Sequence, residues 1–192
     1  MSFDYGQRHK KEIEFVKYHV EKLGVEWVKV YIPKVSKRRE SIPEGPYSEE
    51  AIKKLVSPYR NALFIIYAAA YVAKNGGGQV WYAAHTNDWA VYPDCRPEFV
   101  EKMNELLQVA HLEPVKLQAP FVNLHKYEIV RIGHRLGVDY SKTWSCYKGG
   151  EKHCGKCPTC IDRKLAFSRA GVADPTEYAD SDEEVSMSEA KK

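Results

Sequence analysis

The chain has 192 residues, enough for one α/β domain with a sizeable core and too few for two ordinary domains. Its 29 basic and 26 acidic side chains are interspersed and give a formal net charge of +3, so composition does not support a nucleic-acid partner. The longest apolar run, 62–73, falls short of the ~20 residues of a membrane span, and residues 1–6 do not resemble a secretory signal. We therefore expect a cytoplasmic protein with no membrane partner and no direct nucleic-acid partner.

Hydrophobic periodicity in the first third of the chain predicts strand, helix, strand and then a long loop. A short strand opens the chain, and apolar residues at helical spacing over 13–23 predict a helix that ends at Gly24. Alternation over 28–32 predicts the second strand. Residues 33–58 contain four prolines and the basic run 37–39 without sustained periodicity, which favours a loop over the sheet edge or the active site.

The rest of the chain continues this alternation. The predicted elements are a helix over 61–75 that is apolar on all sides, a strand over 79–84, a helix from Pro97, a strand over 115–117, and helices over 127–136 and 161–170. Strands that alternate with helices predict a Rossmann-like α/β fold, a parallel sheet covered on both faces, with ligands beyond the carboxyl ends of the strands. We assign residues 1–175 to this single domain and 176–192 to a disordered tail, and we place Trp27, Trp81 and Trp144 in the core.

Four of the five cysteines form the pattern C-x7-C-x2-C-x2-C near the C-terminus, namely Cys146, Cys154, Cys157 and Cys160. Two residues between cysteines let a tight turn direct both sulfurs at one point, and four soft thiolates in a tetrahedron suit structural zinc. The same C-x2-C-x2-C spacing also occurs in iron–sulfur proteins. We expect the adjacent His153 to stay away from the metal, and Cys95 to pack as a buried apolar residue.

The zinc-binding loop predicted over 146–160 is poor in apolar side chains. It has too little apolar surface to hold a fixed shape by burial. Metal binding, worth ~10 kcal/mol or more, would replace that missing core and anchor the helix that follows.

Four segments then carry a resemblance to a known family. They are residues 3–9 (FDYGQRH), 59–61 (YRN), 88–99 (DWAVYPDCRPEF) and 137–160, which contains the cysteine pattern. Together they resemble the 7-cyano-7-deazaguanine synthases over nearly the whole chain, and the four cysteines fall on the zinc ligands of that family.

The resemblance implies a pyrophosphatase-loop ATP ligase with an adenine nucleotide alpha hydrolase-like fold. Such an enzyme adenylates 7-carboxy-7-deazaguanine, lets ammonia displace AMP to give an amide, and dehydrates the amide to the nitrile with a second ATP. The implied cofactors are structural Zn²⁺ and ATP with Mg²⁺, and the implied oligomer is a homodimer. The product feeds queuosine-type tRNA modification or deazaguanine modification of DNA.

The sequence departs from the family at its beginning. The family starts with a strand and a Ser-Gly-Gly-x-Asp-Ser loop that cradles ATP phosphates, whereas Met1 falls where the family's second strand begins. We expect this piece to lie upstream of Met1 or to come from a separate N-terminal fragment. The alternative is a non-catalytic, zinc-stabilised deazaguanine-binding protein derived from the same fold.

The resemblance also implies site residues. Lys126, at the start of a predicted helix, takes the place of a phosphate-contacting catalytic lysine. The candidates for substrate and ATP binding are Asp4, Gln7, Arg8, His9, Arg60, Asn61, Asp88, Tyr92, Asp94 and Arg96. Simpler roles compete for some of them: Asp4 can cap a turn, Asn61 can cap a helix, and residues 92–94 can form a rigid turn.

Overall fold

The computed structural model describes residues 1–33 and 41–179. Its strands are β1 (Ser2–Asp4), β2 (Lys29–Tyr31), β3 (Gln79–Trp81) and β4 (Lys116–Gln118). Its α-helices are α1 (Lys11–Leu23), α2 (Glu49–Leu55), α3 (Arg60–Lys74), α4 (Pro97–Val109), α5 (Lys126–Arg135) and α6 (Pro158–Ala170). Three short 3-10 turns, at Thr86–Asp88, Pro93–Cys95 and Tyr140–Lys142, lie between them.

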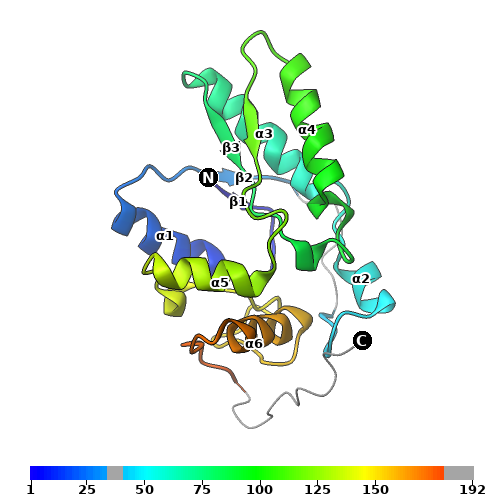
Figure 1. The fold of residues 1–192 in the computed structure, drawn as a ribbon, viewed down its shortest axis with the longest axis vertical. Coiled ribbons are helices and arrows are strands. Elements are labelled where there is room, and N and C mark those ends of the chain that lie inside the picture. The colour runs from blue at the N-terminus through cyan, green and yellow to red at the C-terminus, as the bar shows by residue number, and fades with distance from the viewer. Residues whose placement is uncertain (34–40, 180–192) are drawn as a thin grey trace.

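The strands pair in parallel, which confirms the α/β prediction (Figure 1). Phe3 of β1 lies opposite Val30 of β2, and Val80 of β3 lies opposite Leu117 of β4. The expectation of one continuous sheet is wrong for the described residues, because they form two separate two-stranded sheets. Within this part of the chain, β1 and β3 each keep one edge without a strand partner.

One helix, α3, contacts both sheets. Its residues Ile65 and Ala69 belong to the same buried cluster as Val80 of β3. On an adjacent face, Phe64 stacks on Phe3 of β1, with ring centroids 4.1 Å apart and planes 7° apart. The two sheets therefore share a helical support although they do not share hydrogen bonds.

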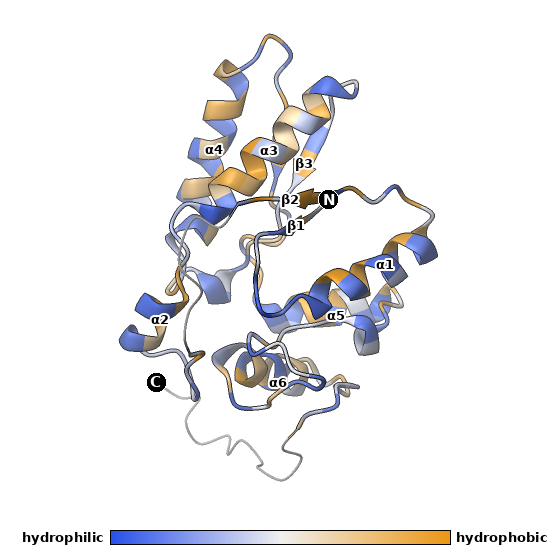
Figure 2. Cartoon of the chain, turned by 180° about the vertical axis from the view of Figure 1, so that it is seen from behind, coloured by the Kyte–Doolittle hydropathy of each residue, from blue (hydrophilic) through white to orange (hydrophobic). Residues whose placement is uncertain are grey.

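The largest core cluster lies between the β3–β4 sheet and helices α3 and α4. Its buried members are Ile65, Ala69, Val80, Met103, Leu107, Val115 and Leu117. The apolar helix predicted over 61–75 packs on the sheets along one side, and its other side leaves Leu63 and Tyr67 45% and 48% exposed. Figure 2 shows apolar residues along most of this helix. Trp81, expected in the core, is 70% exposed on β3.

A second cluster joins α5 to α6, which lie side by side in Figures 1 and 2. Val130 of α5 packs against Ala166, Phe167 and Ala170 of α6. The hydroxyl of Tyr140 donates to the Val130 carbonyl at 2.8 Å and ties the connecting segment to α5. This packing fixes the helix that carries Cys160 and begins directly after Cys157.

The predicted loop over 33–58 contains a helix, α2, that periodicity did not reveal. Ser48 caps it by accepting a hydrogen bond from the Ala51 N–H at 3.2 Å, and acidic residues occupy its first turn. These are ordinary helix-start signals, but a seven-residue helix is too short to give a sustained apolar repeat. The basic run 37–39 lies outside the described residues.

The C-terminal boundary of the domain extends slightly beyond residue 175. Residues 176–179, assigned to the tail, reach the cysteine-rich loop, where the Ala179 N–H donates to the His153 carbonyl at 2.8 Å. The remainder of the predicted tail lies outside the described residues. Among the described helices, none has the length and apolar character needed to cross a membrane.

Candidate active site and metal centre

The four cysteines predicted as metal ligands meet at one point. Their sulfur atoms all lie within 4.8 Å of one another, and Cys146, Cys157 and Cys160 are fully buried. The Cys160 sulfur lies 3.4 Å from that of Cys157 and 3.9 Å from that of Cys154. Thiolates at about 2.3 Å from one tetrahedral ion stand about 3.8 Å apart, so the cluster fits a single metal ion. A four-iron cluster needs a wider separation, because its metal and sulfide ions lie between the thiolates.

The backbone around the cluster donates hydrogen bonds to two of the sulfur atoms. Cys157 is the N-cap of α6, with Pro158 as the first helical residue. The Cys154 N–H donates to the Cys146 sulfur at 3.4 Å, and the Cys157 N–H donates to the Cys154 sulfur at 3.3 Å. Hydrogen bonds from the thiols of Cys146 and Cys160 lower the pKa of Cys157. A soft divalent cation would find at least one ligand already disposed to lose its proton.

His153 stays outside the group of possible metal ligands, as predicted. Its Nε2 accepts a hydrogen bond from the Ser145 N–H at 3.0 Å, and its ring packs 4.1 Å from that of Trp144. After the last cysteine, Arg163 of α6 forms an ion pair with Asp174 at 3.2 Å. The loop is therefore clamped on both sides of the cysteines.

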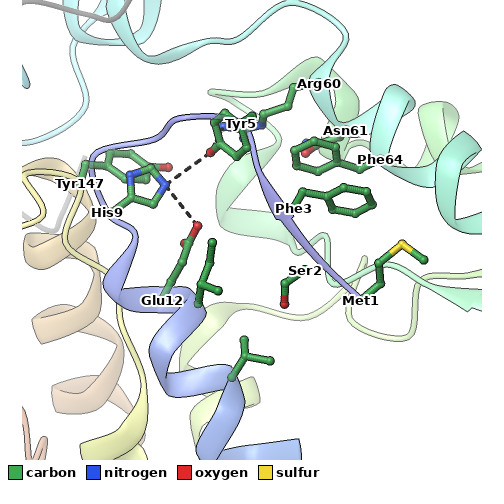
Figure 3. A pocket seen from close by; sticks show the side chains of 12 residues that line it. Met1, Ser2, Phe3, Tyr5, His9, Glu12, Arg60, Asn61, Phe64 and Tyr147 are labelled. Carbon is green, nitrogen blue, oxygen red and sulfur yellow. Dashed lines mark hydrogen bonds and ion pairs between the residues drawn. The ribbon is translucent and has the colours of Figure 1, made fainter. Parts of the chain in front are cut away.

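A cavity of about 390 Å³ opens beside β1 (Figure 3). Its apolar part includes Phe3 of β1, Ile13 and Val16 of α1, and Phe64 of α3. Its polar part is lined by Tyr5, His9, Glu12, Arg60, Asn61 and Tyr147. Three residues predicted for ligand binding, His9, Arg60 and Asn61, thus line the same cavity.

Arg60 is the main cation of this cavity. It donates to the Tyr5 hydroxyl at 3.2 Å and lies over the Tyr5 ring, 5.5 Å from its centroid. Its Nε is buried and has no hydrogen-bond partner among the described residues. His9 bridges the Tyr5 hydroxyl, at 3.4 Å, and the Glu12 carboxylate, at 3.5 Å. A guanidinium with an unused N–H is suited to receive an anionic ligand.

Three tyrosines that sequence reasoning did not select as a group extend this site. The Tyr147 hydroxyl lies 3.3 Å from that of Tyr92, and the Tyr92 ring packs edge-on against Tyr47, 6.4 Å between centroids. Burial raises the pKa of all three phenols, so they remain protonated. Only Tyr92 was predicted. The position of Tyr147 directly after Cys146 was the available signal, because a residue next to a metal ligand is fixed with it.

Lys126 contacts an acidic residue that the sequence analysis did not select. Its ammonium pairs with Asp162 of α6, and its backbone N–H donates to the Asn87 side chain at 2.9 Å. Burial alone would lower the pKa of Lys126, but the carboxylates of Asp162 and Asp88 outweigh it and raise that pKa. The residue expected to contact phosphate is therefore a cation at the start of α5. Asp162 follows Cys160 by two positions, so the helix that carries Cys160 also holds this lysine.

The structure gives the other predicted residues local roles. Asp4 caps the turn after β1 through the Gly6 N–H at 3.1 Å and pairs with Lys10 at 3.1 Å. The Gln7 amide bonds to the backbone of β1 and to the Glu12 carboxylate. Asn61 donates to the Tyr82 hydroxyl at 2.9 Å, and that hydroxyl donates to the Asp94 carbonyl.

Arg8 and Arg96 are not among the residues that line the cavity. Arg96 is exposed and donates to the Trp89 carbonyl at 2.9 Å, away from the cavity. The Arg8 carbonyl lies against Gly149 of the cysteine-rich loop. Cys95 is 5% exposed, and burial raises its pKa to about 12, which confirms its assignment as a buried packing residue.

Asp88 provides a pH-dependent test of the site. Burial raises its pKa from 3.8 to about 6, while its carboxylate lies 3.2 Å from His85 Nε2. Between pH 4 and pH 6 the Asp88 carboxyl stays protonated in the folded state but is ionised in the unfolded state. The free energy of unfolding therefore falls as pH rises from about 4 to about 6. We expect Asp88→Asn to gain stability relative to the unsubstituted chain across that window, by about 3 kcal/mol in all. Urea denaturation at several pH values measures this difference.

The control for that series is Asp139→Asn, because the pKa of this surface acid is lowered by the hydrogen bond from Ser141. Its relative stability should fall with rising pH. An Asp88→Asn difference that does not change between pH 4 and pH 7 would contradict the burial argument.

Fold and site together define an α/β protein in which a four-cysteine centre packs beside a pocket of cations and phenols. The chain matches the family described as "Queuosine biosynthesis protein QueC" over residues 1–171, and it belongs to that family.

Curated relatives agree with this assignment. The chain is 46% identical to the 7-cyano-7-deazaguanine synthase of Caldicellulosiruptor saccharolyticus over 186 residues, which cover 93% of this chain and 83% of the relative. It is 42% identical to the enzyme of the same name from Marinobacter nauticus, over 93% of this chain and 84% of the relative. The corresponding enzyme of Porphyromonas gingivalis strain ATCC 33277 is also 42% identical, over 93% and 85% of the two chains.

Proposed function

We propose that this chain catalyses the ATP-dependent conversion of 7-carboxy-7-deazaguanine and ammonia to 7-cyano-7-deazaguanine. The carboxylate attacks the α-phosphate of ATP and releases pyrophosphate, which leaves an acyl adenylate. Ammonia displaces AMP from this adenylate and gives the amide. The amide oxygen is then adenylated by a second ATP, and loss of AMP with two protons leaves the nitrile. The names of the relatives are the observation that carries this proposal.

The cations of the site suit the charges of these steps. Arg60, with an unused buried N–H, and Lys126, held in its charged form, supply positive charge where phosphate and carboxylate groups must approach each other. An ammonium near the α-phosphate stabilises the charge that develops as pyrophosphate leaves. We assign Lys126 to the binding of ATP phosphate. We assign Arg60, His9 and Asn61 to the side of the pocket that binds the nucleotide.

The phenols and acids suit a purine-like ring. Tyr47 and Tyr92 offer aromatic faces, and Asp88 offers a carboxylate for N–H donors of the ring. Because the pKa of Asp88 lies near 6, the acceptor form dominates at neutral pH. We assign Asp88, Tyr92 and Asp94 to deazaguanine recognition.

We assign the metal at the four cysteines as Zn²⁺ with a structural role. Four thiolates close a tetrahedral site, so that no position is left for substrate. The ion fixes the loop and the start of α6, and neither adenylation nor amide formation is routed through it. Mg²⁺ enters with ATP, and we place the reaction in the cytoplasm, where the thiolates stay reduced.

We further propose that a parallel strand completes the sheet between β1 and β3, and that the ATP loop follows this strand. In a parallel ladder alternate residues bond to opposite neighbours, so Phe3 of β1 and Gln79 and Trp81 of β3 direct backbone groups to the unpaired edges. The apolar part of the cavity lies beside β1. A separate N-terminal fragment that supplies this strand would cover both edges.

The test is release of AMP from ATP in the presence of 7-carboxy-7-deazaguanine and ammonium, with the nitrile identified by mass spectrometry. The assay is run on the metal-loaded chain alone and with a peptide that carries a strand followed by a Ser-Gly-Gly-x-Asp-Ser loop. Turnover in either mixture supports the proposal. Absence of AMP and nitrile in both would refute it and favour a binding protein without catalysis.

A further inference from the structure

Tyr147 connects the metal centre to the pocket. It directly follows Cys146, and its backbone N–H hydrogen-bonds to the Cys157 sulfur. Its ring lines the cavity and packs 5.3 Å from that of His9 (Figure 3). The cysteines therefore hold the main chain of this residue at the wall of the site.

The loop that carries Tyr147 is held against the start of α1 by a close backbone approach. Gly149 has φ +71°, and a Cβ at this position would come within 2.3 Å of the Arg8 carbonyl oxygen. No side chain fits there without movement of the loop. Gly150, the next residue, has ordinary space around it, with its nearest neighbour at 3.6 Å. The position of Tyr147 is thus fixed from the metal side and from the side of α1.

The hydroxyls of the tyrosine group leave one hydrogen to donate. Tyr92 is linked to both Tyr147 and Tyr47, so three hydroxyl hydrogens serve two links. The third hydrogen needs a further acceptor. Either hydroxyl of the Tyr92–Tyr147 pair can be the donor, so Tyr147, the member of the group that lines the cavity, can direct its hydrogen to a ligand there. Other polar groups of the cavity are engaged elsewhere, because Asn61 donates to Tyr82 and the Tyr5 hydroxyl accepts from Arg60.

The charges around Tyr147 identify the kind of acceptor. Its hydroxyl lies within electrostatic range of two cations, Arg60 and Lys126. Asp88, the acid in range of the phenols, is 3.2 Å from His85. A spare donor within electrostatic range of two cations fits an oxyanion.

We propose that the Tyr147 hydroxyl donates a hydrogen bond to the carboxylate of the substrate and holds it between Arg60 and Lys126. This rests on the proposed function, since it takes 7-carboxy-7-deazaguanine as the ligand. The role makes Tyr147 a specificity-determining residue that selects the carboxylated ring over a ring without the carboxylate. The four-cysteine centre then acts on the reaction by fixing this side chain.

The experiment compares the affinities of 7-carboxy-7-deazaguanine and unsubstituted 7-deazaguanine by calorimetry, using the metal-loaded full chain. The protein without substitutions should bind 7-carboxy-7-deazaguanine more tightly than 7-deazaguanine. In Tyr147→Phe this preference should fall about 10- to 100-fold, the effect of losing one hydrogen bond to a charged group, with metal content unchanged. Tyr18→Phe, which removes a surface hydroxyl bonded to Asp139, should leave the preference intact.

Gly149→Ala should weaken the preference by displacing the loop, while Gly150→Ala should not. The inference about Tyr147 would be overturned if Tyr147→Phe kept the full preference for the carboxylated ligand, or if the chain without substitutions bound both ligands equally. Neither result would refute the proposed function. An unsubstituted chain that binds neither ligand would refute the proposed substrate, and the inference with it. Normal discrimination without AMP release would support the Tyr147 contact while counting against catalysis.

Discussion

Removal of the metal from the four-cysteine centre is expected to lower the free energy of unfolding by several kcal/mol and to release the loop over 146–160. Thiolate sites of this kind bind zinc with about 10 to 16 kcal/mol in small domains, and that binding energy becomes folding energy. Only a few half-buried apolar residues, among them Trp144 and Tyr178, pack around the cysteines. The remaining packing of the loop is too small to replace the ion.

Thermal unfolding followed by circular dichroism, with and without a chelator, measures this effect. Cys157→Ser should reproduce it, because it removes a fully buried ligand at the N-cap of α6. Cys95→Ser is the control, since this buried thiol lies apart from the cluster and contacts the Tyr82 hydroxyl. An equal melting temperature before and after complete removal of the metal would contradict a structural role.

Much of the fold and the metal centre could be predicted because the signals are local. The glycine at position 24 ends α1 in the left-handed conformation, at φ +63°, where sequence placed the end of the helix. The cysteine spacing alone predicted the four sulfurs that meet in space. Alternation of strand and helix predicted parallel pairing, since a crossover helix returns the chain in the same direction.

The rest depends on contacts between distant residues, which no local pattern reports. Asp162 and Lys126 are 36 positions apart, and only the packing of α5 on α6 brings them together. Tyr47 and Tyr147 are a hundred positions apart and meet through Tyr92. Trp81 is exposed because it lies on the face of β3 opposite the buried Val80, and the composition of one strand does not tell which face is covered.

Replacement of Lys126 by methionine is expected to reduce the rate of AMP release about 10²- to 10³-fold, the usual cost of losing one charged group that stabilises a transition state. Methionine keeps the apolar stem but removes the ammonium, and its partner carboxylate on Asp162 then has no cation. The double variant Lys126→Met with Asp162→Asn removes this unpaired charge and should recover stability without recovering turnover. Recovery of stability without recovery of turnover distinguishes a catalytic lysine from one that only joins α5 to α6.

Lys102→Met is the matched control, because this surface lysine pairs with Glu105 on α4 and its loss should leave turnover unchanged. Asp162→Asn alone leaves the ammonium in place without its partner, so we expect a smaller reduction than for Lys126→Met. Steady-state AMP release, metal content and thermal unfolding are measured for each variant. Turnover of Lys126→Met within a few-fold of the unsubstituted chain would restrict Lys126 to its ion pair with Asp162 and move the phosphate contact to Arg60, which lines the cavity.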